Sequence, residues 1–120
     1  MEFNRGDILK FVEILSHEDL ENFFSDQSAK KIIFKHSPIC GISARAEEEF
    51  ESWKESFKGE KVLVAIVNVI FGKELSSQIA VRTGIPHASP QILVLDENNN
   101  VLSNTSHYSI TENYLNEAIS

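Results

Sequence analysis

Cys40 is the only cysteine in this chain of 120 residues, and its position favours chemistry over packing. It lies in the stretch SPICGIS, residues 37–43, where an apolar and basic run gives way to a charged one. A lone cysteine is often a small buried side chain. A thiol at the start of a helix, in contrast, lies near free backbone N–H groups and the positive end of the helix dipole, which stabilise the thiolate. We predict a helix start here and therefore a nucleophilic thiol at Cys40.

Ser43 follows the cysteine by three residues and has two possible roles. Serine readily caps a helix, and its hydroxyl could serve only that purpose. Alternatively, the hydroxyl could donate a hydrogen bond to the Cys40 thiolate, although it could not displace a mixed disulfide. Because the chain has no second cysteine, no internal disulfide can form, and the chemistry should stop at a mixed disulfide.

Two basic residues, Lys35 and His36, precede the cysteine at the end of an apolar run. Lys35 is either a solvated lysine or a cleft residue that supplies positive charge to the thiolate and to a substrate carboxylate. His36 is either a partly exposed imidazole or a charge partner of the thiolate. We treat His17 and His87 as surface residues. The four histidines are scattered, and none has ligand spacing with Cys40, so we predict no metal site.

The elements that must position these residues follow from hydrophobic spacing and turn chemistry. Apolar residues recur at helical intervals in four segments, while three β-branched runs and one short polar run read as strands. The run KVLVAIVNV is apolar on both faces, as a central strand requires. The tract ENNN at 97–100 predicts a hairpin turn, because asparagine tolerates positive φ. The expected helices cover 17–25, 40–57, 73–83 and 111–119, and the expected strands cover 30–36, 61–69, 91–96 and 101–106.

This order predicts a single α/β domain over residues 1–120 with a thioredoxin-like fold. A right-handed parallel βαβ unit and an antiparallel C-terminal hairpin would form a four-stranded mixed sheet flanked by helices. In that topology the loop containing Ser89 and Pro90 faces the cysteine. Proline at the start of a strand is compatible with a cis peptide bond. The backbone of Ser89 would then face outward and could pair with an extended substrate.

Composition narrows the possible functions further. With 42% apolar and 24% charged residues the chain is typical of a globular protein, without a run long enough to span a membrane. A net charge of −7 argues against binding to nucleic acid or anionic lipid. The N-terminal segment lacks the pattern of a signal peptide, and we expect a cytoplasmic protein.

Four separated motifs resemble the monothiol bacilliredoxin family of the thioredoxin superfamily. They are Lys35-His36-Ser37, Cys40-Gly41-Ile42-Ser43, Ser89-Pro90-Gln91 and the segment Thr105-Ser106-His107-Tyr108-Ser109-Ile110-Thr111. The family usually has proline at the position of Gly41, and Ser43 stands where thioredoxins carry a second cysteine. The resemblance implies a monothiol oxidoreductase in which Cys40 removes a low-molecular-weight thiol, bacillithiol, from client proteins. It also implies Cys40 and Ser43 as catalytic residues, and Lys35, His36, Ser89, Pro90 and His107 as substrate-binding residues, with no cofactor beyond the thiol.

Two alternatives remain open at this stage. The motif Cys40-Gly41-Ile42-Ser43 also resembles the Cys-Gly-Phe-Ser signature of monothiol glutaredoxins, which carry [2Fe–2S] clusters together with glutathione. The chain lacks the Gly-Gly pair that helps that family to hold glutathione, so this alternative ranks second. The third possibility is a non-catalytic interaction module in which Cys40 is merely packed. A titration of the thiol reactivity would separate that case from the first two.

Overall fold

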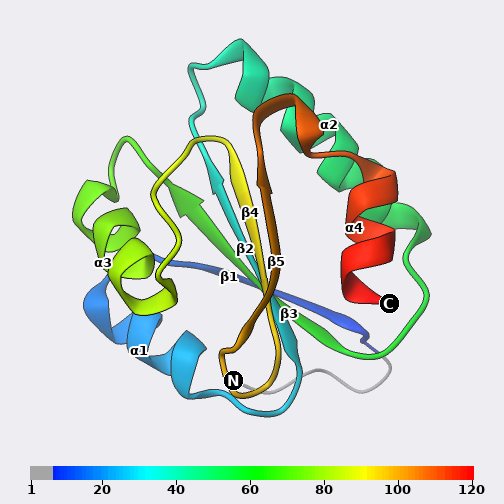
Figure 1. Cartoon of the computed structure of the whole chain (residues 1–120), viewed down its shortest axis with the longest axis horizontal. Helices are drawn as coiled ribbons and strands as arrows, with labels where there is room; N and C mark the ends of the chain where they lie inside the picture. Colours follow the sequence, from blue (N-terminus) through cyan, green and yellow to red (C-terminus); the bar gives the residue numbers. More distant parts are fainter. Residues whose placement is uncertain (1–6) are drawn as a thin grey trace.

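The computed structural model describes residues 7–120, which form a twisted five-stranded sheet with helices on both faces (Figure 1). The strands are β1 (Leu9–Glu13), β2 (Lys30–His36), β3 (Val62–Asn68), β4 (Gln91–Leu95) and β5 (Val101–Ser106). Their order across the sheet is β1-β3-β2-β4-β5. The pairs β1–β3 and β3–β2 are parallel, whereas β2–β4 and β4–β5 are antiparallel. This is the expected thioredoxin-like arrangement, with one strand more than predicted.

The prediction of four strands was wrong because β1 was missed. Its sequence, LKFVE, is only five residues long and carries two charged side chains. Such a segment has little strand signal of its own. It becomes a strand because it pairs in parallel with the buried strand β3, with Leu9 opposite Val62 and Glu13 opposite Ile66. The pairing partner lies about fifty residues away in sequence, so local patterning could not reveal it.

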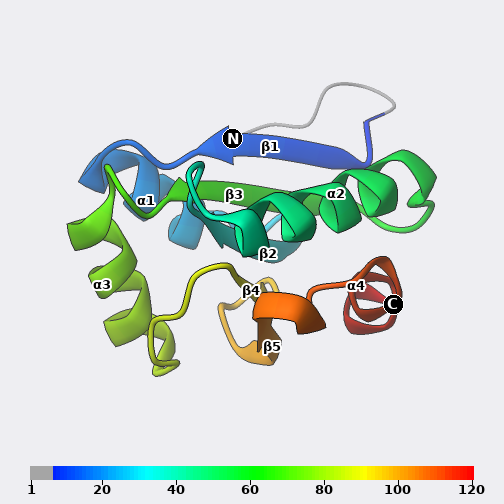
Figure 2. The same cartoon turned by 90° about the horizontal axis from the view of Figure 1, so that it is seen from above.

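The helices are α1 (His17–Ser25), α2 (Gly41–Ser56), α3 (Lys73–Thr83) and α4 (Glu112–Ile119), with a short 3₁₀ turn η1 (His107–Ser109) before α4. Helices α1 and α3 cover one face of the sheet, and α2 and α4 cover the other (Figure 2). Thr111 caps α4 as predicted, because its side chain accepts a hydrogen bond from the Tyr114 N–H at 3.1 Å. Gly84 ends α3 with a φ of 74°, a conformation that favours glycine.

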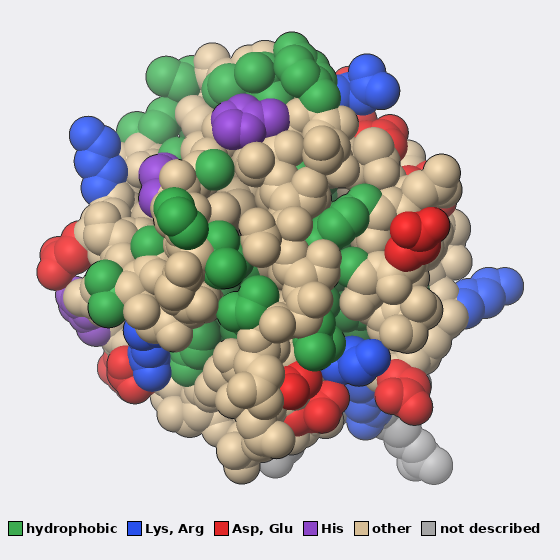
Figure 3. Space-filling view, in the orientation of Figure 1, with side chains coloured by type: hydrophobic (Ala, Val, Ile, Leu, Met, Phe, Trp, Pro, Cys, Tyr) green, Lys and Arg blue, Asp and Glu red, His purple; other side chains and the backbone are tan. Residues whose placement is uncertain are grey.

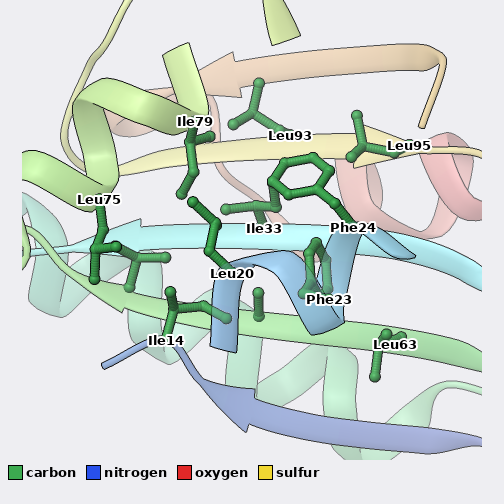
Figure 4. Packing of buried hydrophobic residues seen from close by; sticks show 12 residues of the cluster. Ile14, Leu20, Phe23, Phe24, Ile33, Leu63, Leu75, Ile79, Leu93 and Leu95 are labelled. Atoms are coloured by element: carbon green, nitrogen blue, oxygen red, sulfur yellow. The ribbon is translucent and has the colours of Figure 1, made fainter. Parts of the chain in front are cut away.

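Two apolar clusters, one on each face, hold the helices to the sheet. On the α1–α3 face, Leu20 and Ile79 lie over Ile33 of β2 (Figure 4). On the α2–α4 face, Phe50 and Trp53 pack over the next set of side chains from the same strands. Because side chains of a strand alternate between faces, the face of Ile33 also receives Lys35. Within residues 7–120 no helix is long and apolar enough to cross a membrane.

The strand register gathers three connections at one end of the sheet. Gln91, the first residue of β4, lies opposite Lys35 near the end of β2 and opposite Ser106 at the end of β5. The segment that leads from β2 to α2, the loop before β4 and the turn η1 therefore meet at this end, which is at the top of Figure 1.

Candidate functional site

Cys40 occupies the position directly before the first turn of α2, as the sequence predicted for a helix start. Its backbone is extended, with φ −104° and ψ 128°, and its carbonyl accepts the first helical hydrogen bond from the Ala44 N–H at 3.1 Å. The thiol is partly accessible. Hydrogen bonds from the backbone N–H groups of Ser43 and Ile42 lower the pKa of Cys40, burial opposes them, and the Ser43 hydroxyl adds a smaller lowering effect. This arrangement stabilises the thiolate, and its partial exposure allows the sulfur to attack a substrate.

Ser43 does not cap α2, because Cys40 is the N-cap and no side chain makes a capping hydrogen bond there. The Ser43 side chain is buried, and its oxygen accepts a hydrogen bond from the Ser37 N–H at 3.0 Å. The same hydroxyl contributes, less than the two backbone N–H groups, to the lowered pKa of Cys40. One hydroxyl can do both, because it combines one donor with two acceptor lone pairs. Ser43 thus ties the β2–α2 connection to the first turn of the helix and contributes to the thiolate site.

Lys35 and His36 point to opposite faces of the sheet, because neighbouring residues of a strand alternate. His36 is half-buried on the α2 face, with its ring centroid 5.6 Å from that of Phe34, and it lines a cavity of about 380 Å³ between β1 and α2. Lys35 is fully buried on the α3 face. The sequence placed the two residues side by side, but the fold separates their side chains.

Lys35 lies beneath the start of α3 rather than in open solvent. Its Nζ donates to the carbonyl of Ser76 at 3.3 Å and to Nδ1 of His87 at 3.2 Å. Within residues 7–120 no carboxylate lies within ion-pair distance of it. Burial lowers the pKa of Lys35 to about 8, so the side chain is still mostly protonated at neutral pH. Burial and the Lys35 charge lower the pKa of His87, which keeps this imidazole neutral and able to accept the hydrogen bond.

Ser89, Pro90 and His107 lie together where the loop before β4 meets the turn η1. The Ser89–Pro90 peptide bond is cis. The N–H of His107 donates to the carbonyl of Pro90 at 3.0 Å, which joins the turn η1 to the loop before β4. Within the described residues the backbone N–H and C=O of Ser89 make no hydrogen bond. They therefore remain available to pair with an extended substrate.

Two residues that the sequence did not single out also belong to this end of the molecule. His87 was assigned to the surface, and it is exposed overall, but one ring nitrogen covers the buried Lys35. Ser76, on α3, is only 2% exposed and its hydroxyl has no hydrogen-bond partner among residues 7–120. The only sequence signal for Ser76 was its position next to Leu75 on a predicted amphipathic helix. No local pattern indicated the role of His87.

Several apolar side chains are exposed at the same end of the molecule as Cys40. Ile39, the residue before the cysteine, is 86% exposed, and Tyr108 of η1 and Phe71 after β3 are also largely exposed. Figure 3 shows hydrophobic side chains gathered along the upper rim of the molecule, over the β2–α2 connection and η1, with histidine beside them. Exposed apolar patches of this kind often mark a surface that contacts another molecule. In the described part of the chain, no three metal-ligating side chains lie close enough to hold a metal ion.

Comparison with known proteins matches most of the chain to one protein family. Residues 12–115 match the family model for monothiol bacilliredoxin BrxC. Among solved structures, one protein described as having a thioredoxin fold has a TM-score of 0.77 at 23% identity, covering 92% of this chain and 94% of that one. Thioredoxin from Trypanosoma brucei brucei has a TM-score of 0.74 at 17% identity, covering 98% and 94% of the two chains. A thioredoxin from Malassezia sympodialis has a TM-score of 0.66 at 21% identity, covering 99% and 93%. The structural likenesses establish the thioredoxin fold.

Proposed function

The chain belongs to the monothiol bacilliredoxin family, and we propose that it is a thiol-disulfide oxidoreductase that removes a low-molecular-weight thiol from client proteins through Cys40. By family membership, we propose bacillithiol as that thiol. The observation that carries the proposal is the setting of the lone thiol. Two backbone N–H groups and the Ser43 hydroxyl stabilise its thiolate at the start of α2, and no second cysteine is available in the sequence.

The exchange proceeds in two balanced steps. The Cys40 thiolate attacks the small-thiol sulfur of a client mixed disulfide, the old S–S bond breaks, and the client leaves as a thiolate that takes a proton from water. Cys40 then holds the small thiol in a mixed disulfide. A second molecule of the small thiol, as its thiolate, attacks this disulfide, releases a symmetric small disulfide and restores the Cys40 thiolate. Ser43 cannot carry out the second step itself, because a hydroxyl is not a thiol.

The surrounding residues would bind the two halves of the substrate. The free backbone groups of Ser89, next to Pro90, are suited to pair with an extended segment of the client. His107 would support this edge through its hydrogen bond to the Pro90 carbonyl. Lys35 and His36 would act on the substrate from opposite sides of β2, Lys35 through its charge and His36 from the wall of the cavity beside α2.

Intact-mass analysis after exposure to bacillithiol disulfide tests the proposal directly. The wild-type chain should gain one small-thiol adduct, and free bacillithiol should remove it. The Cys40→Ser variant should gain none. The same wild-type protein should release the thiol from a bacillithiolated client, and a Cys40→Ser variant with full activity in that assay would refute the mechanism.

The Ser43→Cys variant tests why the chemistry stops at the mixed disulfide. Ser43 follows Cys40 by three residues in the first turn of α2, and its hydroxyl contributes to the lowered pKa of Cys40, so an introduced thiol at this position would lie close enough to attack the adduct. The adduct should then be short-lived and give way to an internal disulfide between Cys40 and the new thiol. A stable adduct in this variant would mean that geometry, rather than the missing thiol, stops the wild-type reaction.

Two measurements separate this function from its alternatives. An iron–sulfur carrier would form a coloured dimer after anaerobic reconstitution with iron, sulfide and glutathione, bridged by one Cys40 from each subunit. We expect a colourless protein. A non-catalytic module would show slow alkylation of Cys40 with an unshifted pH dependence. We expect fast alkylation with a midpoint below the ordinary pKa of a free thiol.

A further inference from the structure

A hollow of about 580 Å³ lies between the β2–α2 connection and the first half of α3, and we call it the α3 pocket. One wall is Ile39, the residue directly before Cys40, so the pocket lies next to the segment that carries the reactive thiol. It is lined by Ile39, Val69, Ile70, Lys73, Ser76, Ser77 and His87. A substrate that carries its sulfur to Cys40 could therefore place the rest of its body in this hollow.

The charges around the α3 pocket are positive. Lys73 lies on its rim, and the Lys35 ammonium lies directly beneath it, hydrogen-bonded to the Ser76 carbonyl and to the His87 ring that line the hollow. No carboxylate lines the pocket. The nearest acidic residue in sequence, Glu74, contacts His17 at 3.5 Å instead. An anion in the pocket would thus meet two cations that have no carboxylate partner within residues 7–120.

The pocket also has an unused hydrogen-bond donor. Ser76 lines the hollow and is 2% exposed, and its buried hydroxyl has no partner among the described residues. A buried hydroxyl without a partner costs free energy, so such groups commonly bind a ligand or water. The first turn of α3 adds its dipole, because Gly72 at the helix start offers no side-chain cap to its free N–H groups. A hydroxyl, a helix start and two cations converge on the same hollow.

We propose that the α3 pocket binds a carboxylate of the small thiol while its sulfur exchanges at Cys40. This inference rests on the proposed function, since it assigns a place to the half of the substrate that becomes attached to Cys40. Lys73 and the Ser76 hydroxyl would contact the carboxylate. Lys35 would act from below as a positioning charge, held in place by His87.

Three small symmetric disulfides of nearly equal size test the charge preference. They are 3,3′-dithiodipropionate, which is anionic, hydroxyethyl disulfide, which is neutral, and cystamine, which is cationic. Each second-order rate constant for adduct formation at Cys40 is divided by that of the same disulfide with an unfolded Cys40 peptide, which removes the effect of the leaving-group pKa. The normalised rate should be highest for the anionic disulfide and lowest for the cationic one. The ratio of anionic to neutral rates should fall as salt rises, because ions screen the charge of Lys73 on the rim.

Variants then assign the preference to the pocket. Lys73→Gln and Ser76→Ala should each reduce the anionic-to-neutral ratio by about threefold to tenfold, because the anionic rate falls more than the neutral rate. Lys58→Gln removes the same charge from an exposed position after α2 that lines neither the α3 pocket nor the cavity beside α2, and serves as the matched control. It should leave the ratio near that of the wild type.

Four results would overturn the inference. Equal normalised rates for the three disulfides, or a loss in Lys73→Gln no larger than in Lys58→Gln, would show that the α3 pocket does not select a carboxylate, even though Cys40 exchanges as proposed. A loss in Ser76→Ala that is equal for all three disulfides would assign a structural role to this hydroxyl. If no disulfide gives an adduct at Cys40, the proposed function itself fails, and the inference fails with it.

Discussion

Replacing Lys35 with methionine should change how the stability of the protein depends on pH. Burial lowers the pKa of Lys35 from 10.5 to about 8, which at about 1.4 kcal/mol per pKa unit corresponds to about 3 kcal/mol. Between these two values the unfolded chain binds a proton that the folded chain has released. The free energy of unfolding of the wild type should therefore rise with pH across this window, by about 3 kcal/mol in total. Below pH 8 both states hold the proton, and the folded state bears the full cost.

The Lys35→Met variant keeps an unbranched side chain in the same space but carries no proton. It leaves the acceptors on Ser76 and His87 unpaired, a loss that does not depend on the protonation of Lys35. Between about pH 7 and about pH 11, the wild type should therefore gain about 3 kcal/mol of unfolding free energy relative to the variant. Other groups that titrate in this range do so in both proteins, so their contributions cancel in the difference.

Urea unfolding followed by Trp53 fluorescence measures this difference, because Trp53 is the only tryptophan and is fully buried. The exposed Lys58 provides the matched control, since Lys58→Met removes a lysine that is not buried. Its difference from the wild type should stay nearly constant with pH. If the difference for Lys35→Met is equally constant, the ammonium is not held in a desolvated site and the reasoning about its charge is wrong.

Two further predictions concern the start of α2. Ser43→Ala removes one group that stabilises the thiolate and leaves the two backbone N–H groups. The pH midpoint of Cys40 alkylation should therefore rise but stay below that of an unfolded control peptide. Ser52→Ala, on an exposed part of the same helix, should not change this midpoint. Gly41→Pro should raise the unfolding free energy by about 0.5 to 1 kcal/mol, because Cys40 already has the extended backbone that precedes proline and a Cβ at Gly41 meets no atom within 4 Å. The thiolate donors do not include Gly41, so the adduct rate should be kept, and a slower adduct would contradict this account.

Most of the fold was predictable because its elements carry strong local signals. The helices His17–Ser25 and Lys73–Thr83 and the strand Lys30–His36 have the predicted bounds. The hairpin before β5 turns at Asn99, whose φ of 68° is the conformation that the asparagine tract predicted. Strand β1 was missed for the opposite reason. It depends on a partner far away in sequence, and its own residues carry almost no strand pattern.

The candidate site was predictable where it depends on sequence position and not where it depends on side-chain direction. The position of Cys40 before α2 follows from a helix start, which the sequence reveals. The separation of Lys35 from His36 requires knowing which face of β2 meets α3. The contact between Lys35 and His87 joins residues 52 positions apart, and neither has a local pattern that indicates the other. The roles of these residues in catalysis or substrate binding stay predictions.

The burial of Lys35 has a physical rationale if the α3 pocket binds a carboxylate. The chain has a net charge of −7, so its overall field repels an anionic thiol. An exposed lysine would counter that field only weakly, because salt screens surface charges over about 8 Å. A buried ammonium is screened much less, so its electrostatic attraction for a carboxylate held next to it is stronger. The same desolvation that destabilises the fold thus makes this charge effective beside Cys40, and both effects should disappear together in Lys35→Met.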